Sequence, residues 1–276
     1  VGRDGDALQF ASKELRGNRE VALEAVRRDG AALHHASKEL RGDSEIVMAA
    51  FRKAGDYALR HASEELKDNK VFMLQVVELD GDALSHASAE LKADREVALE
   101  AVKQSGCALQ YASEKIRGDR EVVLEAVRSD GEALQHAAGR LRGDREIVSE
   151  AFQTKAGYAL RHASEELRGD RDFMLEAVRK YGDALQHASS ELKGDKEVVL
   201  EAVKKAGYAL QHASDKLKGD KEVVLEAVKK YGYALQYASD ELRGDKEIVL
   251  EAFIMAGYAA MRFSKQEPNP RFSLWN

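Results

Sequence analysis

The chain has almost none of the residues that interrupt or cross-link a fold. Its 276 residues include two prolines, at positions 268 and 270, one cysteine, Cys107, and one tryptophan, Trp275. A single cysteine excludes an internal disulfide and a cysteine-rich zinc site. Both prolines lie near the end, so residues 1–267 lack proline, the residue that most often breaks a helix.

The chain also lacks an excess of positive charge and a long apolar run. Its net charge is -6 and its isoelectric point about 5.8, which argues against a groove that neutralises nucleic-acid phosphates. No apolar run approaches the roughly 18 residues that a membrane helix needs. We therefore expect no membrane insertion and a soluble chain, inside the cell or in the lumen or stroma of an organelle.

What the chain does have is repetition, with a period of 25 or 26 residues. Each repeat opens with an Asp or Asn, continues through an apolar helical run to a Gly, and then carries an Ala-Leu pair. The opening residues are Asn18, Asp43, Asn69, Asp94, Asp119, Asp144, Asp170, Asp195, Asp220 and Asp245. A period in this range is typical of a solenoid. The sequence predicts an all-α solenoid of about ten repeats, each with two short helices.

The repeat that opens at Asp119 shows how its helices are expected to begin and end. Asp119 is a favourable N-cap for the first helix, and Gly131 is expected to end that helix in the left-handed conformation. A second helix is predicted from there to Gly143. We expect residues 1–264 to form one solenoid and residues 265–276 a tail or cap. Since Val1 aligns with Val26, the sequence opens within a repeat, as expected of a fragment or a processed chain.

The repeat resembles a known family. The pattern D-x-E-V-V-L-E-A-V-x-x-x-G-x-A-L-x-x-A-S-x-x-L is similar to the repeat called domain of unknown function 4116, over residues 5 to about 260. The resemblance implies a helical-repeat architecture, no assigned activity and no functional residues. The last repeat departs from the pattern, because Met261, Arg262 and Phe263 stand where the preceding repeat has Gln236, Tyr237 and Ala238.

A longer period runs through the repeats. Phe51, Phe152 and Phe253 replace a Val of most other repeats, and their spacing is 101 residues each time (152 − 51 and 253 − 152). The repeats that open at Asp43 and Asp144 are also one residue longer than the others. One explanation is the duplication of a four-repeat block. The other is that a larger core side chain and an extra residue alter the stacking angle every fourth repeat.

Histidine and serine are the residues that suggest chemistry. His recurs at one place in seven repeats, but Phe10, Tyr111 and Tyr237 fill the same place in others, which indicates a packing niche rather than a metal or pH-sensing ladder. His34 and His35 are adjacent and are expected to point apart. The serine of the recurring Ala-Ser pair is expected to bond a carbonyl one turn back. The seven histidines are His35, His61, His86, His136, His162, His187 and His212. We expect no catalytic residue, no metal and no cofactor.

Partner binding is expected where the repeats differ from one another. The surface-facing positions of the second helix vary most: Gln9, His34, Arg60, Ser85, Gln110, Gln135, Arg161, Gln186, Gln211 and Gln236. Seven of the nine tyrosines lie from residue 158 onward, and exposed Tyr is a good interface anchor. The tail either caps the last repeat or docks on a partner. The candidate partner-binding residues are Arg60, Arg161, Tyr208, Tyr233, Tyr258, Phe272 and Trp275.

These observations predict a non-catalytic scaffold, linker or peripheral subunit that binds protein partners within a larger assembly. One alternative is a nucleic-acid reader with one base per repeat. It needs a basic stripe along the variable positions, where only Arg60 and Arg161 supply charge. The other alternative is a non-catalytic arm of a larger enzyme.

Overall fold

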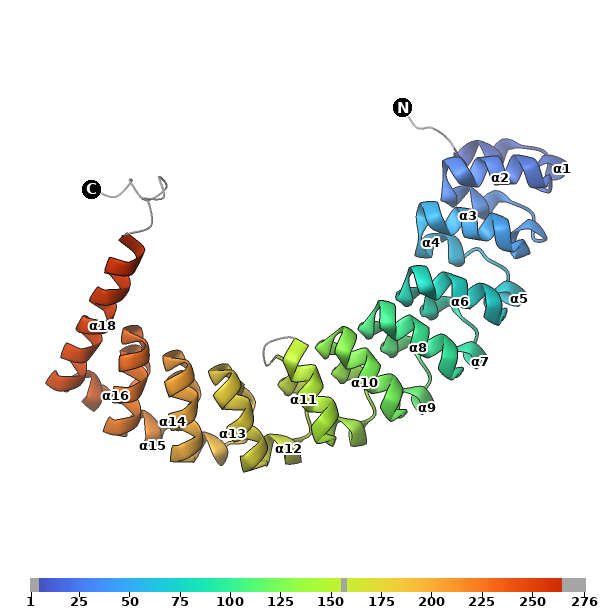
Figure 1. The fold of residues 1–276 in the computed structure, drawn as a ribbon. Helices are drawn as coiled ribbons and strands as arrows, with labels where there is room; N and C mark the ends of the chain where they lie inside the picture. Colours follow the sequence, from blue (N-terminus) through green and yellow to red (C-terminus); the bar gives the residue numbers. More distant parts are fainter. Residues whose placement is uncertain (1–4, 155–157, 265–276) are drawn as a thin grey trace. The chain divides into compact units, whose positions relative to one another are not determined.

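The structure, a computed structural model, describes residues 5–154 and 158–264. The chain divides into two compact units, Val1–Lys155 and Ala156–Asn276, here called the N-terminal and C-terminal units. Within each unit, first helices of successive repeats pack against one another, as α8 does on α10 and α14 on α16 (Figure 1). The described residues contain helices and turns but no strand. The predicted all-α solenoid is confirmed.

Each repeat before the one that opens at Asp245 has three segments rather than the two predicted helices, whereas that repeat has the single helix α18 among the described residues. The first segments are α2 (Arg19–Arg28), α3 (Ser44–Ala54), α6 (Lys70–Leu79), α8 (Arg95–Gln104), α10 (Arg120–Ser129), α11 (Arg145–Thr154), α13 (Arg171–Lys180), α14 (Lys196–Lys205), α16 (Lys221–Lys230) and α18 (Lys246–Ser264). The second segments, mostly 3₁₀ helices (η), are η1 (Gly5–Phe10), η2 (Gly30–His35), α4 (Asp56–Leu59), η4 (Gly81–His86), η5 (Gly106–Tyr111), η6 (Gly131–His136), η8 (Tyr158–His162), η9 (Gly182–His187), η11 (Gly207–His212) and η12 (Gly232–Tyr237). The third segments are α1 (Lys13–Arg16), η3 (Leu40–Gly42), α5 (Glu64–Lys67), α7 (Ala89–Lys92), α9 (Glu114–Arg117), η7 (Gly139–Gly143), α12 (Glu165–Gly169), η10 (Leu192–Gly194), α15 (Asp215–Lys218) and α17 (Asp240–Arg243).

The first helix forms as its sequence predicts. The Asp119 carboxylate accepts hydrogen bonds from the backbone N–H groups of Glu121 (3.0 Å) and Val122 (3.1 Å) and so caps α10. Val122, Ala126 and Val127 are fully buried. A ten-residue helix is marginal in water by itself, so burial of this apolar face against neighbouring segments supplies the stability of the repeat.

The predicted second helix is wrong in its continuity, and the recurring serine explains why. In the Asp94 repeat, Ala112 is extended (φ -70°, ψ 155°) and ends η5. Ser113 is then the N-cap of α9, and its Oγ accepts a hydrogen bond from the Ile116 amide at 3.4 Å. The Ser113 amide donates to the carbonyl of Lys92 in the preceding repeat at 2.9 Å. The serine therefore starts a helix and joins two repeats, instead of bonding one turn back within a helix.

The glycine after each first helix also has a different role from the predicted one. Gly131 is not a left-handed cap, because the extended residue Asp130 (φ -149°, ψ 115°) ends α10 and Gly131 begins η6. At the equivalent Gly106, a Cβ atom would lie 2.3 Å from the carbonyl oxygen of Ala126 in the next repeat. Glycine is required here because the backbones of adjacent repeats touch.

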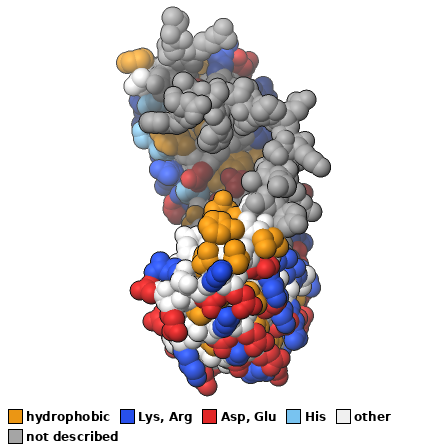
Figure 2. All heavy atoms as spheres, turned by 90° about the vertical axis from the view of Figure 1, so that its left-hand side faces the viewer, with side chains coloured by type: hydrophobic (Ala, Val, Ile, Leu, Met, Phe, Trp, Pro, Cys, Tyr) orange, Lys and Arg blue, Asp and Glu red, His pale blue; other side chains and the backbone are white. Residues whose placement is uncertain are grey.

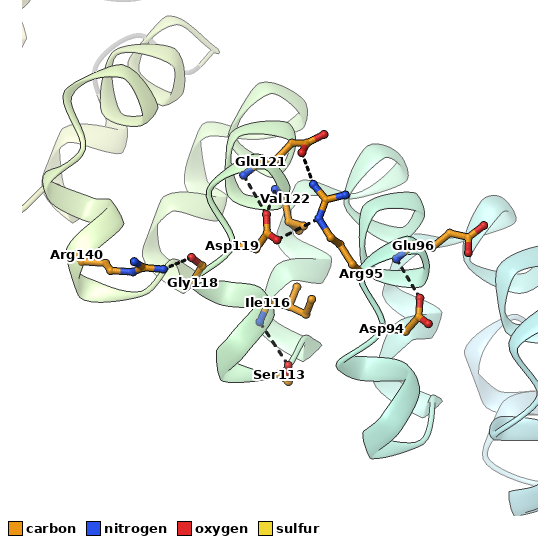
Figure 3. Close-up of polar contacts among 10 residues, drawn as sticks. All are labelled: Asp94, Arg95, Glu96, Ser113, Ile116, Gly118, Asp119, Glu121, Val122 and Arg140. Atoms are coloured by element: carbon orange, nitrogen blue, oxygen red, sulfur yellow. Dashed lines mark hydrogen bonds and ion pairs between the residues drawn. The ribbon is translucent and has the colours of Figure 1, made fainter.

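Ion pairs connect the first helices of successive repeats. Arg95 Nε lies 3.1 Å from Asp119 Oδ2, and the same guanidinium pairs with Glu121 (Figure 3). The Asp119 carboxylate thus caps α10 and binds the arginine of α8 at once. Burial raises the pKa of Asp119, but hydrogen bonds from the Val122 amide and from Arg95 outweigh it and leave this pKa below its ordinary value. The same cation position pairs with both carboxylates of the next repeat at Arg19, Lys70, Arg120, Arg171, Lys196 and Lys221.

The longer Asp43 repeat differs locally from its neighbours. Its first helix, α3, has 11 residues and ends at Gly55, whose φ of 56° is the one positive glycine φ among the described residues. Phe51 is buried, as expected of a core residue. Across the boundary with the next repeat the second segments pack together, with α4 on η4. The duplication and stacking-angle explanations of the 101-residue period both stay predictions.

Candidate protein-interaction surface

The variable positions of the second segment do face the solvent. Eight of the ten are exposed, and Ser85 and Gln186 are half-buried. Arg60 is exposed and lies 3.7 Å from the Asp56 carboxylate, so its charge has a partner within its own repeat. Arg161, also exposed, donates from Nε to His162 Nε2 at 2.9 Å. Neither of these two candidate partner-binding residues offers an unengaged guanidinium.

Two of the candidate tyrosines lie close together in the C-terminal unit, along with a third that the site prediction omits. The Tyr208 and Tyr231 ring centroids are 6.4 Å apart, and those of Tyr231 and Tyr233 are 5.5 Å apart. The three side chains are 39%, 43% and 58% exposed, respectively. We call these three residues the tyrosine surface. Tyr231 directly precedes Gly232, the glycine after the first helix, and Tyr233 directly follows it. The sequence therefore already places both tyrosines at the same turn.

The tyrosine surface is held in place by one polar contact and by its backbone positions. The Tyr208 hydroxyl donates to Asp183 Oδ2 at 2.9 Å. Partial burial and this hydrogen bond raise the pKa of Tyr208, so the hydroxyl stays protonated at neutral pH. Tyr231 ends α16 in an extended conformation, and Tyr233 belongs to η12. Tyr208 and Tyr233 therefore lie in short 3₁₀ helices, η11 and η12, and Tyr231 is the residue that joins α16 to η12.

An apolar groove of about 400 Å³ adjoins this surface. We call it the C-terminal groove; its lining residues are Gly232, Tyr233, Leu235, Gln236, Arg243, Val249, Ala252, Phe253 and Ala256. It lies between η12 and α18, which pack against each other. Figure 2, in which the α18 side of Figure 1 faces the viewer, shows hydrophobic side chains grouped on this face among charged ones.

Phe253 contradicts its expected role as a core residue. Its counterparts Phe51 and Phe152 are each 5% exposed, whereas Phe253 is 71% exposed, with Leu250 and Ile254 exposed beside it. The cause is the length of α18, which runs to Ser264 instead of ending near the glycine at position 257. Without the usual break, no second segment of the described repeat folds over the Phe253 ring.

Three candidates cannot be placed on the surface. Tyr258 belongs to α18, but its side chain is outside the described residues, as are the side chains of Met261, Arg262 and Phe263. Phe272 and Trp275 lie in the tail beyond residue 264, which is outside the described residues as well. Docking or capping by this tail therefore stays a prediction.

The seven histidines of the recurring position are half-buried, and at three of them burial disfavours the charged form and lowers the pKa. Burial is the main cause that lowers the pKa of His187, to about 4, and positive charges at Lys193 and Arg168 add to it. The pKa values of His61 and His212 are also lowered, again chiefly by burial. His187 therefore stays neutral through the range near pH 6.5 in which a histidine switch works. Among the described residues, no group of three or more His, Cys, Asp or Glu could hold a metal ion.

The prediction that His34 and His35 point apart is wrong. Their ring centroids are 5.0 Å apart, and His34 Nδ1 also lies 3.1 Å from Nδ1 of His61 in the next repeat. Rotation about the side-chain bonds brings the rings together although adjacent Cα–Cβ bonds diverge. One nitrogen of the His34–His61 pair donates this hydrogen bond and the other accepts it.

Three-segment helical repeats, stacked within each unit and joined by backbone contacts and ion pairs, define an α-solenoid repeat protein. The chain belongs to the family described as Domain of unknown function (DUF4116), whose model matches residues 1–41, 18–67, 69–117, 119–168, 170–218 and 220–266. Most matches span two 25-residue repeats, so the family's own unit is a pair of them. No curated protein matches the chain. No helix in the described ranges is long and apolar enough to cross a membrane.

Proposed function

We propose that the chain is a non-catalytic scaffold that binds a protein partner through the tyrosine surface of its C-terminal unit. The observation that carries this proposal is the run of three touching, exposed rings, Tyr208, Tyr231 and Tyr233, which ends at an apolar groove. Tyrosine is enriched at the centres of protein interfaces, where its ring is buried and its hydroxyl keeps a polar partner.

The groove extends this surface in a way that suits a protein partner. Phe253, Leu250 and Ile254 add exposed apolar area next to Tyr233. A contiguous apolar patch with a charged rim is characteristic of interaction sites on soluble proteins. A partner segment that covers Tyr233 and Phe253 together would bury an anchor ring on each side of the groove.

The non-catalytic part of the proposal is supported by how the reactive side chains are used. Ser113 caps a helix, as do the equivalent serines of most other repeats. Asp119 and its counterparts cap helices and bind the cation of the preceding repeat. Since these groups serve the structure, we propose binding rather than chemistry as the role of the chain.

The test begins with affinity capture from an extract of the source organism, followed by identification of the retained protein and measurement of its Kd by calorimetry. The variant carries Tyr208→Ser, Tyr231→Ser and Tyr233→Ser. We expect its affinity to fall at least about 100-fold, because interface tyrosines commonly contribute about 2 kcal/mol or more each.

The matched control is Tyr57→Ser, since Tyr57 is a tyrosine of the N-terminal unit with 45% exposure. It should bind the partner as the unaltered chain does. Circular dichroism and urea unfolding must show that the triple variant is folded. The proposal is wrong if the folded triple variant retains full affinity, or if Tyr57→Ser weakens binding equally.

A further inference from the structure

Ion pairs on the outer face of the first helices follow a second rule, distinct from the one at the helix starts. The basic residue stands nine positions after the Asp or Asn that caps its helix. It binds a glutamate that stands six positions after such a capping residue, either in the same helix or in the first helix of the next repeat. Arg128 Nε lies 3.5 Å from Glu150 Oε1, and Arg179 Nε lies 2.9 Å from Glu201 Oε2, both across a repeat boundary. Lys103, Lys204 and Lys229 bind Glu100, Glu201 and Glu226 within one helix.

The rule is broken at two consecutive repeats of the N-terminal unit. Ala49 and Gln75 occupy the glutamate position of α3 and α6. A glutamate at position 49 would be within reach of two arginines, Arg27 of the preceding repeat and Arg52 of the same helix. Because Ala49 stands there, both arginines lack this partner. Gln75 removes the remaining partner of Arg52. Within the described residues, neither Arg27 nor Arg52 forms an ion pair, although both keep the position that is paired at Arg128 and Arg179.

These two arginines line a groove of about 470 Å³ that crosses α3. Leu23 and Arg27 come from α2, Met48, Arg52 and Lys53 from α3, and Gln75 from α6. We call it the arginine groove. Its floor has apolar side chains, Leu23 and Met48, and its cationic groups are exposed. Ser44, which replaces the cation that begins most other first helices, adds a hydroxyl to the lining.

Two carboxylates of the helices that line the arginine groove, Glu45 and Glu24, are already engaged. Glu45, the one acidic residue in its lining, pairs with Arg19 of the preceding repeat. Glu24 of α2 lies 2.9 Å from Arg28. Thus Arg27, Arg52 and Lys53 supply three positive charges for which the surrounding helices provide no counter-ion within ion-pair distance, on a chain whose overall charge is negative.

We propose that the arginine groove binds an acidic segment of a protein partner, whose Asp or Glu carboxylates pair with Arg27 and Arg52. The chain itself indicates this chemistry, because at equivalent boundaries the same arginine position receives a glutamate carboxylate. Guanidinium groups match carboxylates in geometry, and the apolar floor suits the aliphatic part of a peptide. Glu45 at the rim would repel the dense phosphates of a nucleic acid.

This inference rests on the proposed scaffold role but concerns a different surface, so the two can fail separately. The probe is a fluorescein-labelled synthetic peptide of glutamates around a central leucine, and its counterpart has glutamine in place of every glutamate. Binding to the full chain is followed by fluorescence anisotropy at low ionic strength. We expect the glutamate peptide to bind, the glutamine peptide to bind at least about tenfold more weakly, and added salt to weaken the complex.

The decisive variant restores the repeat's own carboxylates with Ala49→Glu and Gln75→Glu. It should remain folded, since it recreates pairs found elsewhere in the chain, and should lower the affinity for the glutamate peptide at least about tenfold. Ala49→Gln is the matched control, because it adds the same bulk without charge, and it should bind within about twofold of the unaltered chain. Arg27→Gln with Arg52→Gln should also lose binding.

Four outcomes would overturn the proposal. The first is that the unaltered chain fails to distinguish the glutamate from the glutamine peptide. The second is that the Ala49→Glu, Gln75→Glu variant binds as well as the unaltered chain. The third is displacement of the peptide by inorganic phosphate beyond the effect of sodium chloride at equal ionic strength, which would identify a small-anion site. The variant at Tyr208, Tyr231 and Tyr233 should bind the peptide normally, and a loss there would place the peptide on the other surface.

Discussion

The α2–α3 and α13–α14 boundaries share one backbone plan and differ in a single side chain of the ion pair. Arg27 and Arg179 stand at the same position of the repeat, but Arg179 meets Glu201 at 2.9 Å whereas Arg27 faces Ala49. At both boundaries an aspartate caps the second of the two first helices, and a glycine, Gly30 or Gly182, lies against a backbone carbonyl of the next repeat. The buried side chains differ, since Phe51 of α3 stands where α14 has Val203. The comparison teaches that the same caps and the same glycine contact occur both with and without an ion pair on the outer face of the first helices.

The largest expected effect comes from replacing the glycine that touches the next repeat, a contact that both boundaries share. Gly106→Ala and Gly207→Ala each place a Cβ atom about 2.3 Å from a carbonyl oxygen of the next repeat, Ala126 or Ala227. The backbones must then move apart, and we expect each variant to lose about 3 kcal/mol of unfolding free energy. Urea unfolding followed by circular dichroism measures the loss.

Gly194→Ala serves as the control for the contact glycines. A Cβ there meets no atom closer than Ser214 Oγ at 3.8 Å, so we expect a change within about 0.5 kcal/mol. Equal losses at Gly106, Gly207 and Gly194 would show that contact between the backbones of adjacent repeats does not explain these glycines.

A smaller effect is expected from the carboxylate that begins a helix and receives the cation of the preceding repeat. Asp119→Ala removes the cap of α10 and the partner of Arg95, and should cost about 1–2 kcal/mol of unfolding free energy. Asp119→Asn, the residue at the equivalent positions 18 and 69, keeps the cap and should cost less. If the two variants lose the same amount, the charge of Asp119 rather than its capping oxygen is the stabilising group.

The same residue predicts the direction of the pH dependence. Because the folded state holds the pKa of Asp119 below its ordinary value, its contribution is fully present above the unfolded pKa of about 4 and is lost as the pH falls through the folded one. The unaltered chain should therefore lose stability below about pH 4 more steeply than Asp119→Asn does. Urea titrations at a series of pH values compare the two.

The smallest expected effect comes from substitutions that exchange the ion-pair residues of the two boundaries. Glu201→Ala makes the α13–α14 boundary resemble α2–α3, and Ala49→Glu does the reverse. Since these pairs are exposed, we expect the unfolding free energy to fall by about 0.5 kcal/mol in the first variant and to rise by a similar or smaller amount in the second. Double-mutant cycles with Arg179→Gln and Arg27→Gln measure the coupling. A loss of about 2 kcal/mol at Glu201 would show that the outer face does affect stacking.

The period and the caps of the repeat could be predicted from sequence, whereas its segmentation could not. Apolar residues spaced three and four apart suit either a continuous α-helix or a 3₁₀ helix followed by a short α-helix. Only the extended Ala112 and the capping Ser113 distinguish the two, and a serine inside an apolar pattern does not by itself mark a break. The role of the glycine after each first helix could not be predicted either, because the close approach of two repeats is a property of the tertiary structure.

The candidate surface was partly predictable for similar reasons. Tyr208 and Tyr233 follow a turn glycine and point outward, as expected. Phe253 was not predictable as an exposed residue, because the local sequence resembles that around the buried Phe51, and exposure depends on the course of α18. Ala49 is visible when the repeats are compared with one another. The groove around it also requires the position of Gln75 on α6, which sequence alone does not supply.

The cation that begins most first helices of the N-terminal unit allows a repeat to be removed without loss of the ion pair at the new junction. Arg95 reaches only the first turn of the next repeat, and that turn carries an Asp and a Glu whether it opens at Asp119 or at Asp144. Excision of residues 119–143 would join Gly118 to Asp144 and offer Arg95 the same pair of carboxylates, now from Asp144 and Glu146. Whole repeats can therefore be lost or gained during evolution while this ion pair is kept at the new junction.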